Sequence, residues 1–126
     1  MSWRLIEGRQ ITVGEGDGPV NTGMQVAQGD TLIFNATGSI WAGVWWTGEN
    51  GPEGWNNRDG NPKFLLPGAH PYQLLGLLDN GYFEIGRSMR LDETANQGLL
   101  RLEINDDVHG NGTGAFQCTI QHYRND

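Results

Sequence analysis

Two adjacent carboxylates in a glycine-rich segment are the side chains best suited to chemistry in this sequence. Residues 104–120, INDDVHGNGTGAFQCTI, contain Asp106 and Asp107, followed by Asn111 among three glycines. Asp carboxylates and an Asn carbonyl are hard oxygen ligands of the kind that calcium prefers. The spacing is not that of an EF-hand, because Cys118 stands where that loop ends in a bidentate glutamate. A calcium site and a plain solvated acidic turn are both compatible with these residues.

The sequence shows no arrangement typical of a catalytic site. Asp106 and Asp107 are neighbours in one loop, whereas the two carboxylates of a glycosidase must lie on opposite sides of the bond that they cleave. The histidines show no metal-ligand spacing such as His-x-x-x-His; they are His70, His109 and His122. We therefore expect a binding protein and not an enzyme.

The single cysteine is predicted to be structural. Cys118 alternates in phase with Phe116 and Ile120, which is typical of a small buried hydrophobic residue. A nucleophilic thiol would need a neighbouring base, and the pattern places none beside it. With only one cysteine, the chain can form no internal disulfide.

The net charge excludes some classes of partner. The 126 residues include 15 Asp and Glu but only 8 Lys and Arg, giving a formal charge of −7. Nucleic acids and anionic membranes need a basic surface, so we expect neither as a partner. No apolar run is long enough to span a membrane, and the start MSWRLIEG lacks the apolar core of a secretory signal. These features predict a chain made in the cytoplasm, which would be released or displayed only by a route without such a signal.

Hydrophobic alternation predicts an all-β protein. Short segments of period two are separated by Gly, Asn, Asp and Pro, and helical periodicity is scarce. About eight evenly spaced strands of this kind indicate a jelly-roll-like β-sandwich, and no linker divides residues 1–126, so we expect one domain. The expected strands cover residues 3–6, 24–27, 31–37, 74–78, 82–85, 87–91, 98–104 and 115–122.

Two turns and one long segment connect these strands. Asn80-Gly81 is the strongest hairpin signal, since both residues tolerate positive φ. The last two strands are expected to form a hairpin around the acidic loop. The polar segment 42–69 contains Trp45, Trp46 and Trp55, whose flat faces either stack on a sugar ring or cover one open end of the sandwich.

Four features together are similar to one lectin family. They are an aromatic residue near the N-terminus at Trp3, a Gly29-Asp30 turn before an apolar strand, GPEG at 51–54, and LLRLEINDD followed by NGTGAF at 99–116. The combination resembles the bacterial galactose-binding lectins typified by LecA (PA-IL), over nearly the whole chain. The segment LPGAHPYQLLGLL also resembles related jelly-roll modules of larger bacterial proteins.

The resemblance implies a calcium ion that binds two hydroxyls of a galactose ring directly. By this resemblance, Asp106 is the bidentate carboxylate and Asn111 is a side-chain ligand that also lies near the sugar. Backbone carbonyls would come from about Ala42 and about Val108. The carbohydrate site would further include the segment around Arg58, Asp59 and Lys63, with a loop tryptophan such as Trp45 in apolar contact.

The sequence departs from the family pattern at the site. Gly112 replaces the second Asn of the pattern, which removes one oxygen ligand, and Asp107 is the candidate replacement. Residues around Arg58 do not match the family's sugar-contacting His and Gln. We expect a calcium-dependent, galactose-type lectin that becomes multivalent as a homo-oligomer, either a dimer or a tetramer. The alternative is a metal-free jelly-roll domain for interaction or assembly, and the glycine at position 112 favours this alternative.

Overall fold

The structure is a computed structural model that describes residues 3–43, 48–55, 64–106 and 110–125. Over these ranges the chain forms nine β-strands, and none of the described residues belongs to a helix that could cross a membrane. The strands are β1 (Trp3–Gly14), β2 (Val20–Val26), β3 (Thr31–Trp41), β4 (Glu49–Asn50), β5 (Leu74–Leu78), β6 (Gly81–Glu84), β7 (Ser88–Leu91), β8 (Gly98–Ile104) and β9 (Thr113–Asn125).

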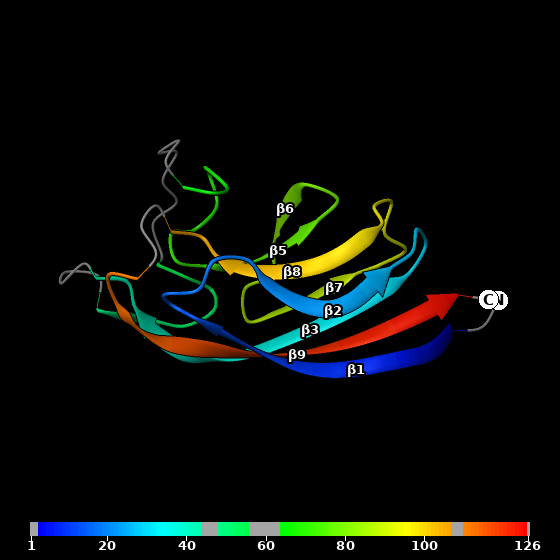
Figure 1. Ribbon diagram of the computed structural model, residues 1–126, viewed down its shortest axis with the longest axis horizontal. Helices are drawn as coiled ribbons and strands as arrows, with labels where there is room; N and C mark the ends of the chain where they lie inside the picture. Colours follow the sequence, from blue (N-terminus) through cyan, green and yellow to red (C-terminus); the bar gives the residue numbers. More distant parts are fainter. Residues whose placement is uncertain (1–2, 44–47, 56–63, 107–109, 126) are drawn as a thin grey trace.

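The strands form two sheets that lie one above the other (Figure 1). One sheet has the order β1-β9-β3-β4, with β7 also paired with β3, and the other has the order β2-β8-β5-β6. Every described pairing is antiparallel. The prediction of an all-β sandwich is confirmed.

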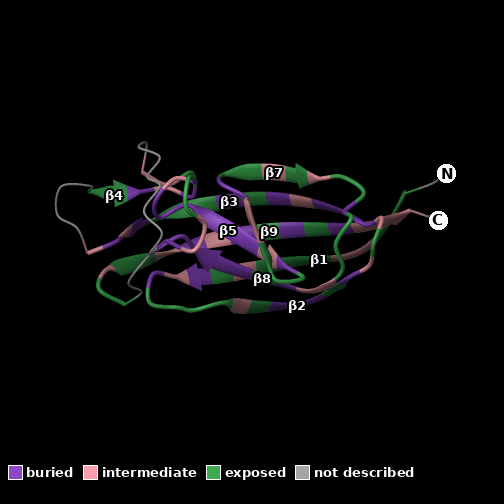
Figure 2. Cartoon of the chain, turned by 90° about the horizontal axis from the view of Figure 1, so that it is seen from above, coloured by how far each residue is buried: buried purple, intermediate pink, exposed green. Residues whose placement is uncertain are grey.

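The core lies between the sheets and follows the alternation of the sequence. In β9, Phe116, Cys118 and Ile120 are fully buried, while Thr119 and Gln121 between and beside them are exposed. The same alternation of buried and exposed segments is visible along the strands in Figure 2. The other large apolar side chains of the core come from both sheets and include Val13, Met24, Leu32, Phe34, Ile40, Leu74, Leu78, Leu100, Leu102 and Ile104.

Several strands are longer than the sequence predicted. The first strand was expected to end at Ile6 but continues to Gly14. It pairs with β9 along this length, from Trp3 opposite Asn125 to Gly14 opposite Ala115. Its middle, EGRQ at 7–10, is polar and weakens the local strand signal. The neighbouring strand supplies the backbone hydrogen bonds regardless, so tertiary pairing overrides local propensity. Strand β3 likewise extends to Trp41, and β4 is an additional two-residue strand inside the long middle segment.

The predicted hairpin between β5 and β6 is present, but its turn is one residue earlier. Leu78 pairs with Gly81, so the two central residues are Asp79 and Asn80. Their φ values are +52° and +64°, as a type I′ turn requires. Gly81 is already the first residue of β6. Asn therefore occupies the second left-handed position in place of Gly.

The acidic loop is not the loop of a hairpin, contrary to the sequence-based expectation. Strand β8 belongs to one sheet and β9 to the other, so the two strands do not pair as a hairpin. Local turn signals do not specify which sheet a strand joins, and both arrangements satisfy the same alternation. Strand β8 ends, and β9 begins, at the same end of the sandwich (Figure 1).

A charged network lies at the other end, near the chain termini. His122 follows the inward phase of β9 and is fully buried. Its Nε2 atom lies 2.6 Å from Oδ2 of Asp30, and its Nδ1 atom lies 3.1 Å from Oε2 of Glu7. The Arg124 guanidinium donates two hydrogen bonds of 3.0 Å to the two oxygens of Asp30. Each buried polar group is thereby compensated.

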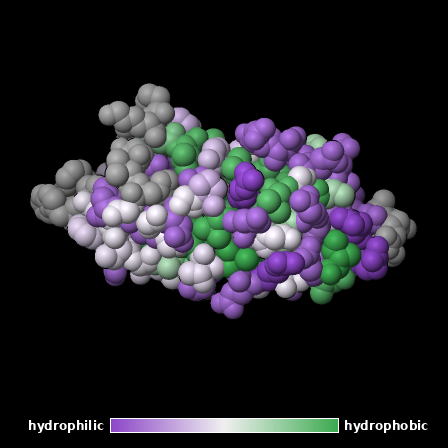
Figure 3. All heavy atoms as spheres, viewed as in Figure 1, coloured by the Kyte–Doolittle hydropathy of each residue, from purple (hydrophilic) through white to green (hydrophobic). Residues whose placement is uncertain are grey.

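The outer surface is mainly polar on the face in view, with hydrophobic side chains in separate groups (Figure 3). The described large hydrophobic residues that are exposed are Trp3 and Leu5, both on the edge strand β1. Trp3 is held by its neighbours, because its ring lies 6.0 Å from that of Tyr123 and the Arg90 guanidinium lies 4.6 Å above it.

Candidate functional site

Three chain segments meet at the end of the sandwich away from the termini: the end of β1, the end of β3 and the approach to β9. Strand β8 ends on the same side of the molecule (Figure 1). Antiparallel pairing explains part of this meeting, because β9 begins beside the last residues of β1 and β3. We refer to the described parts of these segments, residues 14–17, 41–43, 105–106 and 110–112, as the loop cluster.

Asp106 is held at the loop cluster by the residue before it. The Asn105 side chain is fully buried, donates to the carbonyls of Leu66 and His70 at 3.3 and 3.0 Å, and accepts the Leu66 amide at 3.0 Å. These bonds attach the exit of β8 to residues 66–70. Asp106 follows with its side chain buried and its amide donating to the Ile104 carbonyl at 2.9 Å. The Asn-Asp pair thus combines a structural amide with a buried carboxylate.

The backbone directly after Ala42 lies against Asn111. Ala42 is buried directly after β3, and Asn111 lies in the exposed approach to β9. Gly43, with φ of +86°, is so close to Asn111 that an added Cβ would lie 2.6 Å from the Asn111 Cγ. Glycine therefore allows the backbone after β3 to contact the Asn111 side chain.

Position 112 requires glycine for a steric reason that the sequence did not reveal. A Cβ atom at this residue would overlap the Trp41 carbonyl oxygen and lie 2.8 Å from the Trp41 carbonyl carbon and 2.9 Å from the Gly43 amide nitrogen. These neighbours are backbone atoms, which cannot turn away as a flexible side chain can. Close packing between the end of β3 and the residues before β9 therefore excludes a side chain at this position.

Glu15 is a residue of the loop cluster that sequence reasoning missed. Its side chain is buried, and its Oε2 atom accepts the Gly112 amide at 2.9 Å. Its own amide donates to the Gly114 carbonyl at 3.0 Å. The signal for Glu15 was weak, because its segment GEGDG is typical of a solvated turn and lies 97 residues from Gly112. Only the extension of β1 along β9 reveals this proximity.

Several predicted site residues lie outside the described part of the chain. They are Asp107, Val108, Arg58, Asp59, Lys63 and Trp45, together with His109 and Trp46. Trp55 is described, and it is half-buried against the core. Its carbonyl oxygen lies 2.8 Å from Nδ1 of His70, and its amide donates to Pro71 at 2.8 Å. Trp55 therefore covers part of the core, in agreement with the alternative given for the loop tryptophans.

The loop cluster offers oxygen donors of the kind that a hard cation needs. Asp106 and Glu15 supply carboxylates, Asn111 supplies an amide oxygen, and the chain at 41–43 brings backbone carbonyls close. Within the described ranges, no three His, Cys, Asp or Glu side chains gather as a metal site by themselves. A cation in the loop cluster would hence rely on amide and carbonyl oxygens as well, which suits calcium better than zinc.

The other candidate groups have structural roles. Burial raises the pKa of the Cys118 thiol to about 12, so this side chain is a poor nucleophile at neutral pH. His122 belongs to the network with Asp30 and Glu7 at the opposite end.

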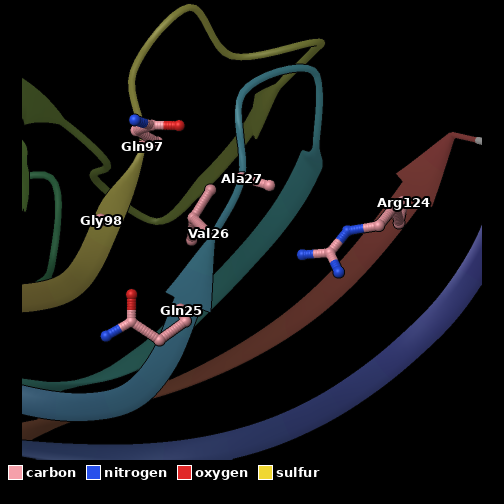
Figure 4. A pocket seen from close by; sticks show the side chains of 6 residues that line it. All are labelled: Gln25, Val26, Ala27, Gln97, Gly98 and Arg124. Atoms are coloured by element: carbon pink, nitrogen blue, oxygen red, sulfur yellow. The ribbon is translucent and has the colours of Figure 1, made fainter.

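Two hollows also lie near the termini and away from the loop cluster. One of about 370 Å³ is lined by Gln25, Val26, Ala27, Gln97, Gly98 and Arg124 (Figure 4). The other, of about 310 Å³, shares Ala27 and Arg124 with it. No predicted site residue lines either hollow.

Comparison with known proteins identifies a related fold. No family model matches the chain, and no curated protein matches it. Among solved structures, the chain is similar to a domain described as the EclA N-terminal domain, a PllA-like lectin. The TM-score is 0.71, the sequence identity is 22%, and the match covers 94% of this chain and 97% of that one. The chain therefore has the fold of a lectin domain over nearly its whole length.

Proposed function

We propose that this protein is a carbohydrate-binding lectin whose binding site is the loop cluster. The observation that supports this proposal is the contact between the backbone at 42–43 and Asn111, at the end of the sandwich where β8 leads into the buried Asp106, in a chain that shares the fold of a lectin domain. These residues come from segments far apart in the sequence. A buried carboxylate, an exposed amide and a neighbouring backbone form a polar site suited to a sugar and a cation.

The proposal includes calcium as the ion that the loop cluster holds. Asp106 would contribute its carboxylate, Asn111 its amide oxygen, and the segment around Ala42 a backbone carbonyl. Bound calcium can accept sugar hydroxyls as ligands, because it takes six to eight oxygens in flexible geometry. The protein groups fix the position of the ion and offer hydrogen bonds to the sugar. The proposed ligand is a galactose-type glycan, by resemblance of the motif at 99–116.

The experiment that tests this proposal is calorimetric titration with calcium, followed by galactose with and without calcium. We expect saturable calcium binding and galactose binding that requires the ion. Asp106→Asn keeps the side-chain shape but removes its charge, so it should weaken both ligands together. Asp92→Asn is the control, because Asp92 is an exposed acid outside the loop cluster that pairs with Arg90 at 2.6 Å. Galactose binding that is equally strong with and without calcium, and unchanged in Asp106→Asn, would contradict the proposal.

Multivalency is part of this proposed function. A single exposed sugar site binds weakly, and an oligomer raises the apparent affinity for a surface with many glycans. We propose a homodimer or tetramer, with the edge strand β1 and its exposed Trp3 and Leu5 as the surface through which copies associate. Sedimentation of the wild type and of Leu5→Lys tests this association, and a monomeric wild type would contradict it.

A second candidate is an interaction domain that binds neither metal nor sugar. The observation that favours it is the packing of Gly112 against Trp41, which excludes a side-chain ligand at that position. The titrations above separate the two functions, because an assembly domain would self-associate without binding calcium or any glycan.

A further inference from the structure

We propose that the Glu15 carboxylate is an additional acidic ligand of the cation in the loop cluster, in place of the side chain that Gly112 lacks. This inference rests on the proposed function, since it assumes that the loop cluster binds calcium. It adds a residue from the N-terminal part of the sequence to a site otherwise formed by residues 41–43, 105–106 and 110–112.

Two hydrogen bonds hold Glu15 against the approach to β9. Its amide donates to the Gly114 carbonyl at 3.0 Å, and its Oε2 atom accepts the Gly112 amide at 2.9 Å. The chain beside it is also close, because a Cβ on Gly16 would lie 3.6 Å from the Gly110 Cα. The carboxylate therefore has a fixed position beside the residue where the ligand is missing.

Burial makes the Glu15 carboxylate a group that a bound cation would stabilise. Glu15 is only 1% exposed, and an ionised carboxylate is costly to bury unless hydrogen bonds or a cation compensate it. A carboxylate offers about four acceptor positions, so accepting the Gly112 amide is compatible with binding a cation. Asp106, 3% exposed, lies in the same loop cluster. A divalent cation would stabilise both buried charges at once.

The steric exclusion at Gly112 explains why the ligand would come from Glu15. The Trp41 carbonyl occupies the place that a Cβ at residue 112 would need. The Glu15 carboxylate instead reaches Gly112 through its amide, which needs no side chain. Replacing a neutral amide by a carboxylate also adds one negative charge to the ligand set, and ligand charge is a main determinant of calcium affinity.

Glu15→Gln separates metal binding from a purely structural role. The glutamine can still accept the Gly112 amide, but it has lost the charge. Glu103→Gln is the matched control, because Glu103 is 4% exposed and accepts a hydrogen bond of 2.8 Å from the Tyr82 hydroxyl. The measurements are calcium affinity by calorimetry, terbium luminescence sensitised by indole excitation, and the rise in melting temperature on adding calcium.

We expect Glu15→Gln to lower the calcium affinity by at least about tenfold, since loss of even an indirect partner of a metal ligand lowers affinity by about 10–100-fold. Its melting temperature in a chelator should stay near that of the wild type, and Glu103→Gln should bind calcium normally. Equal affinities of wild type and Glu15→Gln would overturn this inference and leave the proposed function intact. A wild type that binds no calcium overturns both.

A measurement on the wild-type protein covers the case in which Glu15→Gln does not fold. Protein labelled with ¹³C-glutamate should show a shifted carboxylate stretch in its infrared spectrum when calcium is added, and Asp106→Asn should reduce that shift. Calcium binding with an unchanged glutamate spectrum would show that Glu15 is not a ligand.

Discussion

The Nε2 atom of His122 lies 2.6 Å from Oδ2 of Asp30, 92 residues away, and both side chains are almost completely buried. Glu7 lies 3.1 Å from the other ring nitrogen, so the imidazole lies between two carboxylates. Arg124 completes the network from the same strand as His122. This end of the sandwich is thus held by charges, whereas its middle is held by apolar packing.

Asp30→Asn should destabilise the fold in a pH-dependent way. Burial alone would raise the pKa of Asp30, but hydrogen bonds from Arg124, the Ala27 amide and His122 outweigh it and lower the pKa from 3.8 to about 2. The ionised form therefore stabilises the fold fully above the unfolded pKa, and this contribution is lost as the pH falls through the folded pKa. A shift of this size corresponds to about 2 kcal/mol.

Urea unfolding at pH 7 and at pH 2–3 measures this effect. The cost of Asp30→Asn should be about 2 kcal/mol or more at neutral pH and should shrink in acid. Asp92→Asn is the control, because Asp92 forms an exposed ion pair with Arg90 and should change stability by less than about 1 kcal/mol. A cost for Asp30→Asn that is independent of pH would contradict the proposed charge network.

In the turn between β5 and β6, substitution by alanine should lower stability at Asn80 but not at Gly81. Asn80 has a φ of +64°, where an alanine costs about 1–2 kcal/mol. Gly81 lies outside the left-handed region, and a Cβ there would be 3.5 Å from the Leu78 carbonyl, an ordinary contact. Thermal unfolding of Asn80→Ala and Gly81→Ala should therefore show a loss only for the first. The opposite order would place the turn at Asn80-Gly81, as the dipeptide alone suggested.

The alternation of apolar residues was sufficient to predict the strands that form the core. Phe116, Cys118 and Ile120 share one face in the sequence and are all buried. The full length of β1 was not predictable, because EGRQ at 7–10 has the composition of a loop and becomes a strand only beside β9. Pairing with a distant strand is information that a local pattern does not contain.

The loop cluster was only partly predictable for the same reason. Asp106 and Asn111 stand out by chemistry and motif, and Asn111 lies against Gly43. Glu15 gave no such signal, since its place beside Gly112 depends on the register of β1 with β9. The placement of β8 and β9 in different sheets was missed, because a hairpin and a connection between sheets have similar turn residues.

Cys118 should be unreactive in the folded protein. It is fully buried between the sheets, and burial raises the pKa of its thiol to about 12. A thiol-specific chromogenic reagent should label it quickly in urea and only at the rate of unfolding in buffer at pH 8. Cys118→Ser would place a hydroxyl in the same apolar surroundings and should cost about 1–3 kcal/mol. Rapid labelling of the native protein would show that the core is open at this position.

Gly112→Ala should destabilise the protein although its side chain is small. The added Cβ would overlap the Trp41 carbonyl, and overpacking of this kind typically costs about 1–3 kcal/mol. Gly18→Ala is the matched control, because a Cβ there would have no heavy atom within 4 Å and Gly18 has no positive φ. Chemical denaturation of both variants should show a loss at Gly112 and little change at Gly18.

Gly112→Asn tests how the same steric conflict affects calcium binding. It would restore the residue type of the family pattern, and on ligand chemistry alone it should tighten binding. Because its Cβ meets the same backbone atoms, the chain at 41–43 must move away from Asn111, which disturbs the other donors of the loop cluster. We expect calorimetry to show weaker calcium binding than in the wild type. Tighter binding would mean that the backbone at Trp41 yields readily and that the glycine is not required for packing.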